Sequence, residues 1–161
     1  MNRPTQTQGA RPMDASDART LALATPPITG PLLAQWISGQ RAFLSVLEEE
    51  GPAGADRLAA AHGRALAASG LDAQVFAQVE SVVRNFCGIL TTAQVLDRKV
   101  GQLEGAVNEA DERARIASER DRLLALTPLR QRHGDEAVEA LGAASSELMD
   151  LHARLHRAMP R

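Results

Sequence analysis

A hydrophobic repeat with alternating spacings of three and four runs through the middle of the chain and constrains the fold more than any other feature. Its apolar positions begin at Val75, and smaller residues extend the pattern as far as Leu124. Such spacings average about 3.5 residues, so the apolar side chains form one narrow stripe along a helix. A stripe of this kind is stable in water when another helix covers it. We therefore expect a helical protein that is held together by helix–helix packing.

The larger apolar residues of this repeat are referred to below as the seam. They are Val75, Val79, Val82, Phe86, Ile89, Leu96, Val100, Leu103 and Val107. Because the repeat keeps its phase, it predicts one long heptad-patterned helix over residues 73–126, although Gly88, Gly101 and Gly105 would weaken it. A helix of that length spans roughly 80 Å at 1.5 Å per residue. It would need more than one neighbour to cover its seam.

Length and composition place the chain among folded helical proteins. Its 161 residues suffice for one domain with a core, and 44% of them are hydrophobic. The net charge is -2, and the arginines are interleaved with acidic residues, so no basic surface is expected for nucleic acid. Only 2% of the residues are aromatic, which leaves few side chains on which bases could stack. The expectation is an all-α protein that binds no nucleic acid.

Cysteine usage and hydropathy bear on the compartment. Cys87 is the only cysteine, so an intrachain disulfide and a thiolate zinc cluster are excluded. The most apolar stretch near the N-terminus, residues 21–24, is too short for the core of a signal peptide. No run approaches the roughly 20 apolar residues of a membrane-spanning helix. We expect a soluble, cytoplasmic protein without a membrane span.

The chain divides into a tail and one domain. Residues 1–28 mix prolines with small polar residues and show no sustained apolar period, which predicts a disordered N-terminal tail. Residues 29–161 are expected to form a single helical bundle or coiled-coil domain. Its first helix should begin where Thr29 or Gly30 acts as the N-cap and Pro31 occupies the first turn.

Further helix boundaries are marked by capping residues. A second helix is predicted over residues 55–69, where Gly70 would supply a left-handed C-terminal cap. Asp72 would then cap the start of the long helix. Two later signals, Thr127-Pro128 and Gly134-Asp135, should end that helix and start the last one, with Asp135 as its N-cap.

The last helix carries a second repeat of the same kind, from Val138 to Met159. It could therefore cover part of the seam by folding back, which predicts an antiparallel C-terminal helix beside the long one. The first helix would complete the bundle. Because the last helix is much shorter than the long one, the remaining seam would be covered by the first two helices or by a second copy of the chain.

Residues able to carry chemistry are few. His152 and His156 have the spacing with which two imidazoles can hold one metal ion on a helix, but the zinc-protease pattern is absent and Arg154 lies between them. Cys87 lies beside the seam and is expected to be a buried thiol. No phosphate-binding loop, nucleophile elbow or dinucleotide fingerprint is present. We predict a non-enzymatic protein without a catalytic site, a metal or a cofactor.

The end of the first helix carries three consecutive acids, Glu48, Glu49 and Glu50. Acidic side chains at a helix C-terminus oppose the helix dipole. The three residues are either a solvated polar end or an acidic contact for a partner.

Two functions from different classes fit these observations. In the first, the protein is a helical interaction or assembly module, such as an adaptor, an assembly subunit or a chaperone, that uses the seam to bind a protein partner or to form a homodimer. In the second, it is a monomeric helical bundle that holds a small apolar ligand in its core. The pocket of that bundle would be lined by the aromatic residues Trp36, Phe43, Phe76 and Phe86.

Overall fold

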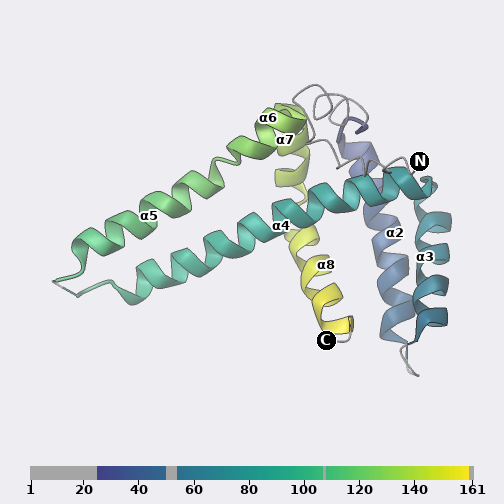
Figure 1. Ribbon diagram of the computed structural model, residues 1–161, viewed down its shortest axis with the longest axis horizontal. Helices are drawn as coiled ribbons and strands as arrows, with labels where there is room; N and C mark the ends of the chain where they lie inside the picture. The colour runs from purple at the N-terminus through teal and green to yellow at the C-terminus, as the bar shows by residue number, and fades with distance from the viewer. Residues whose placement is uncertain (1–24, 50–53, 107, 160–161) are drawn as a thin grey trace, which may run out of the picture.

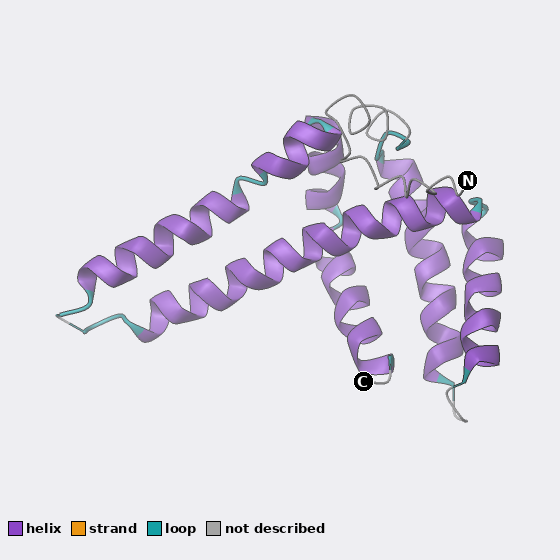
Figure 2. Cartoon of the chain, viewed as in Figure 1, coloured by secondary structure: helices purple, strands orange, loops and turns teal. Residues whose placement is uncertain are grey.

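The computed structural model describes residues 25–49, 54–106 and 108–159. All the regular structure within these residues is helical (Figure 2), which confirms the predicted all-α fold class. The helices are α2 (Gly30–Glu48), α3 (Ala55–Ser69), α4 (Ala73–Gln102), α5 (Ala110–Leu124), α6 (Thr127–His133), α7 (Asp135–Ala143) and α8 (Ser145–Ala158). Most of the predicted tail lies outside the described residues. Ile28, the last residue of the predicted tail, is buried in the core.

Helices α2 and α3 pack side by side as a hairpin (Figure 1). Of the two predicted caps, Thr29 is the one that caps α2, and its hydroxyl accepts a hydrogen bond from the Leu32 amide at 3.3 Å. The two helices approach closely at Gly39, where an added Cβ would lie 2.7 Å from the Ala65 carbonyl oxygen. A glycine facing an alanine therefore sets the separation of this pair.

Helix α4 begins where the sequence predicts. Gly70 ends α3 with a φ of 67°, in the left-handed region that favours glycine. The Asp72 carboxylate then accepts a hydrogen bond from the Val75 amide at 2.9 Å and caps α4. The first half of α4 buries its apolar face, including Phe76 and Phe86, against the other helices.

The single helix predicted over residues 73–126 is wrong. Helix α4 ends at Gln102, and α5 returns alongside its outer half as an antiparallel partner (Figure 1). The connection contains Gly105, whose φ of 93° is left-handed. The 3-4 repeat continues on both sides of the turn because each helix of a hairpin presents an apolar stripe to the other. An unbroken repeat therefore does not distinguish one long helix from two paired helices.

The predicted place of the C-terminal helix is also wrong. The antiparallel neighbour of α4 is α5, whereas α8 crosses the inner half of α4 (Figure 1). The predicted interruptions before α8 are confirmed, since Leu126 has a φ of 53° before α6 and Gly134 a φ of 86° before α7. Asp135 is not the N-cap of α7. Gly134 holds that position, and the Asp135 carboxylate accepts a hydrogen bond from Arg130 at 2.7 Å.

Two regions result from this arrangement. The body comprises residues 25–49, 54–89 and 125–159, which hold α2, α3, the inner half of α4 and α6 to α8, and every residue of the buried core cluster belongs to it. The arm comprises residues 90–106 and 108–124, which are the outer half of α4 and all of α5. It projects away from the body (Figure 1). Among the described arm residues, only Ala93 and Ile116 are buried.

Candidate interaction surface on the arm

The structure divides the predicted seam between the body and the arm. Val79, Val82 and Phe86 are buried in the body, and Val75 and Ile89 are partly buried against the same core. Leu96, Val100 and Leu103 are half-buried in the arm, and Val107 lies outside the described residues. The inner seam residues thus contribute to the body's core. The outer ones lie outside that core.

The arm is thin. Its two buried side chains, Ala93 and Ile116, are the centre of a contact between only two helices. Val95 and Leu124 remain 49% and 46% exposed, although both are large and apolar. Each helix of a hairpin covers one face of the other and leaves the remaining faces in water. Stable bundles are usually built from more than two helices. Of the three large apolar residues that are exposed in the described part of the chain, two therefore lie in the arm, and the third, Met159, follows α8.

One face of the arm is bridged by ion pairs. The Arg120 guanidinium on α5 donates a hydrogen bond of 2.6 Å to the Asp97 carboxylate on α4. It also donates to Asp121 at 3.0 Å. The hollow on this face includes these three side chains together with Leu90 and Leu124. The bridge ties α4 to α5 and raises the pKa of the Arg120 guanidinium, because both carboxylates favour its charged form.

The opposite face carries an open groove. Its outer part is lined by Leu96, Lys99, Glu112, Arg115, Ile116 and Glu119. Its inner part continues from the arm onto the body half of α4 and is lined by Ser81, Arg84, Asn85, Gly88, Ile89, Thr92 and Leu123. Thr92, Leu96 and Lys99 are three or four residues apart, so the two parts follow one face of α4. We refer to the whole as the arm groove. Its floor is apolar, and its edge carries charges of both signs.

The acidic end of α2 has a partner within the chain. The Arg154 guanidinium on α8 donates two hydrogen bonds to the Glu48 carboxylate, at 3.0 and 2.7 Å. Hydrogen bonding to Arg154 lowers the pKa of Glu48 from its ordinary value. The pair joins α2 to α8. Sequence reasoning considered only solvent or an external partner for Glu48, because its true partner lies 106 residues away. Glu49 is exposed, and Glu50 lies outside the described residues.

The two histidines of α8 contact each other. Their Nε2 atoms are 3.1 Å apart, and the rings meet edge to face. Burial lowers the pKa of His152, and the nearby His156 and Arg84 lower it further. Neutral imidazoles can share one hydrogen bond in this geometry, with one ring nitrogen as donor and the other as acceptor. No cluster of three or more metal-ligating side chains occurs among the described residues.

Cys87 is fully buried, and burial raises the pKa of its thiol to about 11. A thiol with a raised pKa carries little of the thiolate form that acts as a nucleophile. The side chain is part of the buried core cluster of the body. It therefore packs as a small apolar group.

The aromatic residues proposed as pocket walls are core residues of the body. Trp36, Phe43, Phe76 and Phe86 are each exposed by 6% or less, and the rings of Trp36 and Phe76 lie 6.0 Å apart. The cavity beside Trp36 at the junction of α2, α4 and α8 has a volume of about 20 Å³. That is room for roughly one water molecule. The indole Nε1 of Trp36 has no hydrogen-bond partner within the described part of the chain.

Comparison with known proteins gives no relative. No protein-family model matches the chain, and neither curated protein sequences nor solved protein structures yield a match. None of the helices in the described residues combines the length and apolarity needed to cross a bilayer. A functional conclusion must therefore come from the geometry of the body and the arm.

Proposed function

We propose that the protein is a non-enzymatic helical interaction and assembly module whose arm docks on a helical segment of another chain. One observation carries this proposal: the arm extends a two-helix hairpin beyond the body (Figure 1) while leaving its apolar residues covered on one side only. A partner helix in the arm groove would cover Leu96 and Leu123, which are half-buried there.

The division between body and arm supports this role. The body has a buried core cluster to which the arm contributes no fully buried member. The arm therefore adds exposed apolar surface, and of its described residues only the partly buried Leu90 packs against that core. Apolar surface exposed beside charged residues is typical of sites where proteins bind one another.

The groove indicates what kind of partner it fits. Leu96, Ile116 and Leu123 offer an apolar floor, whereas Lys99 and Glu112 at its edge have opposite charges. An amphipathic helix with apolar residues three and four apart would bury its stripe on this floor. Its flanking residues would need charges of both signs.

Site-specific photo-crosslinking tests the proposal. A photo-crosslinking amino acid replaces Thr92, an exposed residue that lines the arm groove, in the full chain. The matched control carries it at Ala77, an exposed residue on the body half of the same helix. We expect a discrete adduct, with one identified protein or with the chain itself, from Thr92 alone. The adduct should be absent when Leu96 is replaced by Lys.

The identified partner must then bind the purified chain directly, and Leu96→Lys must weaken that binding. Equal adducts from both positions would mean that the arm has no special role. Absence of any adduct from Thr92 in cells where the chain is expressed at its normal level would contradict the proposal.

The alternative function, a monomeric bundle that holds an apolar ligand, has less support. The cavity beside Trp36 is too small for such a ligand. An apolar hollow of about 160 Å³ lies instead at the end of α2, α3 and α8, lined in part by Leu47, Leu58 and Met159. A ligand there would raise the melting temperature of the body, whereas a ligand of the arm would not.

A further inference from the structure

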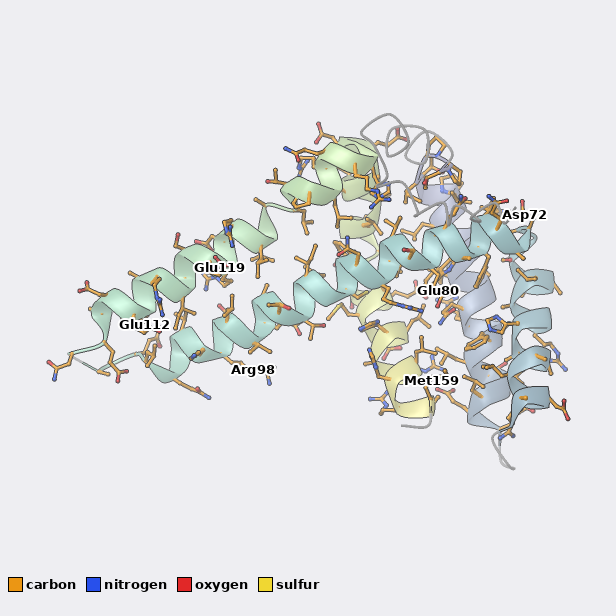
Figure 3. All side chains as sticks on the ribbon, viewed as in Figure 1. Asp72, Glu80, Arg98, Glu112, Glu119 and Met159 are labelled. Atoms are coloured by element: carbon orange, nitrogen blue, oxygen red, sulfur yellow. The ribbon has the colours of Figure 1, made fainter. Side chains whose placement is uncertain are left out.

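Four charged residues of α5 form a stripe of alternating sign, and the first three of them line the arm groove. They are Glu112, Arg115, Glu119 and Arg122. Spacings of three, four and three residues keep them on one side of the helix. Figure 3 shows Glu112 nearer to the tip of the arm and Glu119 nearer to the body. The two arginine side chains are 77% and 75% exposed, and the two glutamates 43% and 45%.

This stripe is complementary to itself when it is reversed. Glu112 and Arg122 lie at equal distances in sequence from Ala117, and so do Arg115 and Glu119. A two-fold axis perpendicular to α5 and level with Ala117 would therefore place each acid of one chain opposite an arginine of the other. The same surface would serve as both halves of the interface, which is the property of a two-fold symmetric contact.

We propose that the occupant of the arm groove is the arm of a second copy of this chain, packed antiparallel with α5 against α5. The inference rests on the proposed function and names its partner. Two arms together would form a four-helix bundle whose core includes Leu96, Ile116 and Leu123 of each chain. The apolar floor would supply burial, and the charge stripe would set the antiparallel orientation.

The ion pairs within α5 leave its charged side chains with hydrogen-bonding capacity for this pairing. Within one chain, Arg115 contacts Glu112 at 2.8 Å and Arg122 contacts Glu119 at 2.6 Å. Each carboxylate can accept about four hydrogen bonds in total, and each guanidinium can donate five. The exposed side chains can therefore keep their partners in α5 and also meet those of a second copy.

The ion pairs of the arm favour the arm-groove face, rather than the face that carries Arg120, as the contact with a second copy. On the far side of the arm, Arg120 is held by Asp97 and Asp121 and so bridges the two helices of its own chain. The charges of the stripe pair with one another within α5, and within the described residues none of the four forms an ion pair with α4. The arm groove can thus receive a second arm without the loss of an ion pair between α4 and α5.

A charge-swap experiment on the full chain tests the proposal. One variant combines Arg115→Glu with Arg122→Glu and leaves only acids on the stripe. The other combines Glu112→Arg with Glu119→Arg and leaves only bases. Like charges would face each other in either homodimer, so we expect the dimer dissociation constant to rise by roughly a hundred-fold in each. An equimolar mixture should form a 1:1 dimer, because the two stripes then have opposite charge.

Analytical ultracentrifugation over a range of concentrations measures the association, and circular dichroism checks that each variant keeps its helix content. A control carrying Arg64→Glu and Arg132→Glu changes the net charge as the acidic variant does, at exposed positions outside the arm. It should dimerise like the wild type. Recovery in the mixture excludes the explanation that the swaps merely unfold α5, since each variant would remain unfolded when mixed.

Two outcomes would overturn this inference. Dimers that persist in both charge variants would show that the stripe does not form the interface, although association through another part of the arm would remain. A wild-type chain that is monomeric at every concentration would exclude the second copy as occupant. The proposed function would still hold in that case if Thr92 crosslinks to one different, identified protein.

Discussion

The body and the arm use similar apolar repeats with different results. In the body, seam residues such as Val79 and Phe86 meet several helices and are buried to 1% exposure or less. In the arm, Leu96 and Leu103 continue the repeat but meet one helix and remain half-buried. A heptad pattern therefore specifies which face of a helix is apolar, whereas the number of neighbouring helices decides how far that face is buried.

The difference has a physical consequence for stability. Buried apolar area stabilises a protein by about 25 cal/mol per Å², so most of the stabilisation comes from the body. Regions with few buried contacts open locally at a lower free energy than the whole domain. We expect the arm to open without unfolding the body, unless a partner covers it.

The largest expected effect is on the free energy of unfolding, which should fall further for a core substitution in the body than for one in the arm. Leu44 in α2 has 0% exposure, and Leu44→Ala removes a side chain that is enclosed in the core. The free energy of unfolding should fall by about 2–5 kcal/mol. Ile116→Ala in the arm should lower the global value by less than about 1.5 kcal/mol, since the surrounding arm can open locally.

Chemical denaturation measures both changes, and hydrogen exchange locates them. Leu44→Ala should speed exchange throughout the body, whereas Ile116→Ala should speed it in α5 and the outer half of α4. Equal global losses for the two variants would contradict the division into body and arm.

A matched pair of glycines gives the next largest effect. An added Cβ at Gly39 would lie 2.6 Å from Phe76 Cε2 and 2.7 Å from the Ala65 carbonyl oxygen. Gly39→Ala should therefore force α2 and α3 apart and cost about 1–3 kcal/mol in the free energy of unfolding. Gly88→Ala is the control, because nothing lies within 4 Å of its Cβ position in α4.

Thermal unfolding of the two alanine variants measures this contrast. Gly88→Ala should stabilise the chain by up to about 1 kcal/mol, through the better helix propensity of alanine. A stabilising Gly39→Ala would show that α2 and α3 are not as closely packed as the structure indicates.

A smaller effect on folding, but a clear one on association, is expected from the outer seam. Leu96→Lys combined with Leu103→Lys puts two charges on the half-buried stripe of the arm. The melting temperature should change less than for Leu44→Ala. Light scattering should show a lower mass than for the wild type at the same concentration, because charged side chains oppose burial in a second copy.

The control for that variant adds two lysines to the body. It combines Met159→Lys, at a residue 41% exposed, with Ala77→Lys at an exposed position of α4. Its mass should equal that of the wild type. An unchanged mass in the arm variant would count against any association through the outer seam.

The helix boundaries that follow from local chemistry were predictable from the sequence. Thr29 and Asp72 cap their helices with their own side chains, and Gly70 and Gly134 adopt backbone conformations that favour glycine. Such signals act within a few residues. They can therefore be recognised without knowledge of the tertiary structure.

Features that depend on distant parts of the chain were missed. The repeat predicts helix through the turn after Gln102 because it continues across that turn, although Gly105 lies within it. The contact of Glu48 with Arg154 joins residues 106 positions apart. The charge stripe of α5 is present in the sequence, but its meaning depends on knowing that α5 is a separate helix with one exposed face.

The smallest effect concerns the Glu48–Arg154 ion pair, one of two that join α2 to α8 within the described residues, the other being Arg41 with Glu147. The pKa of Glu48 lies below its ordinary value of 4.5 because Arg154 donates hydrogen bonds to the carboxylate. A carboxylate with a lower pKa in the folded state favours folding above its unfolded pKa, and this contribution is lost as the pH falls through the folded pKa. Glu48→Gln should therefore lower the melting temperature slightly at pH 7, and the difference from the wild type should shrink as the pH is taken below 4.5. Glu49→Gln removes the same charge at the neighbouring exposed residue and should leave the melting temperature nearly unchanged. A Glu48→Gln difference that stays constant with pH would show that this carboxylate does not hold the body together through Arg154.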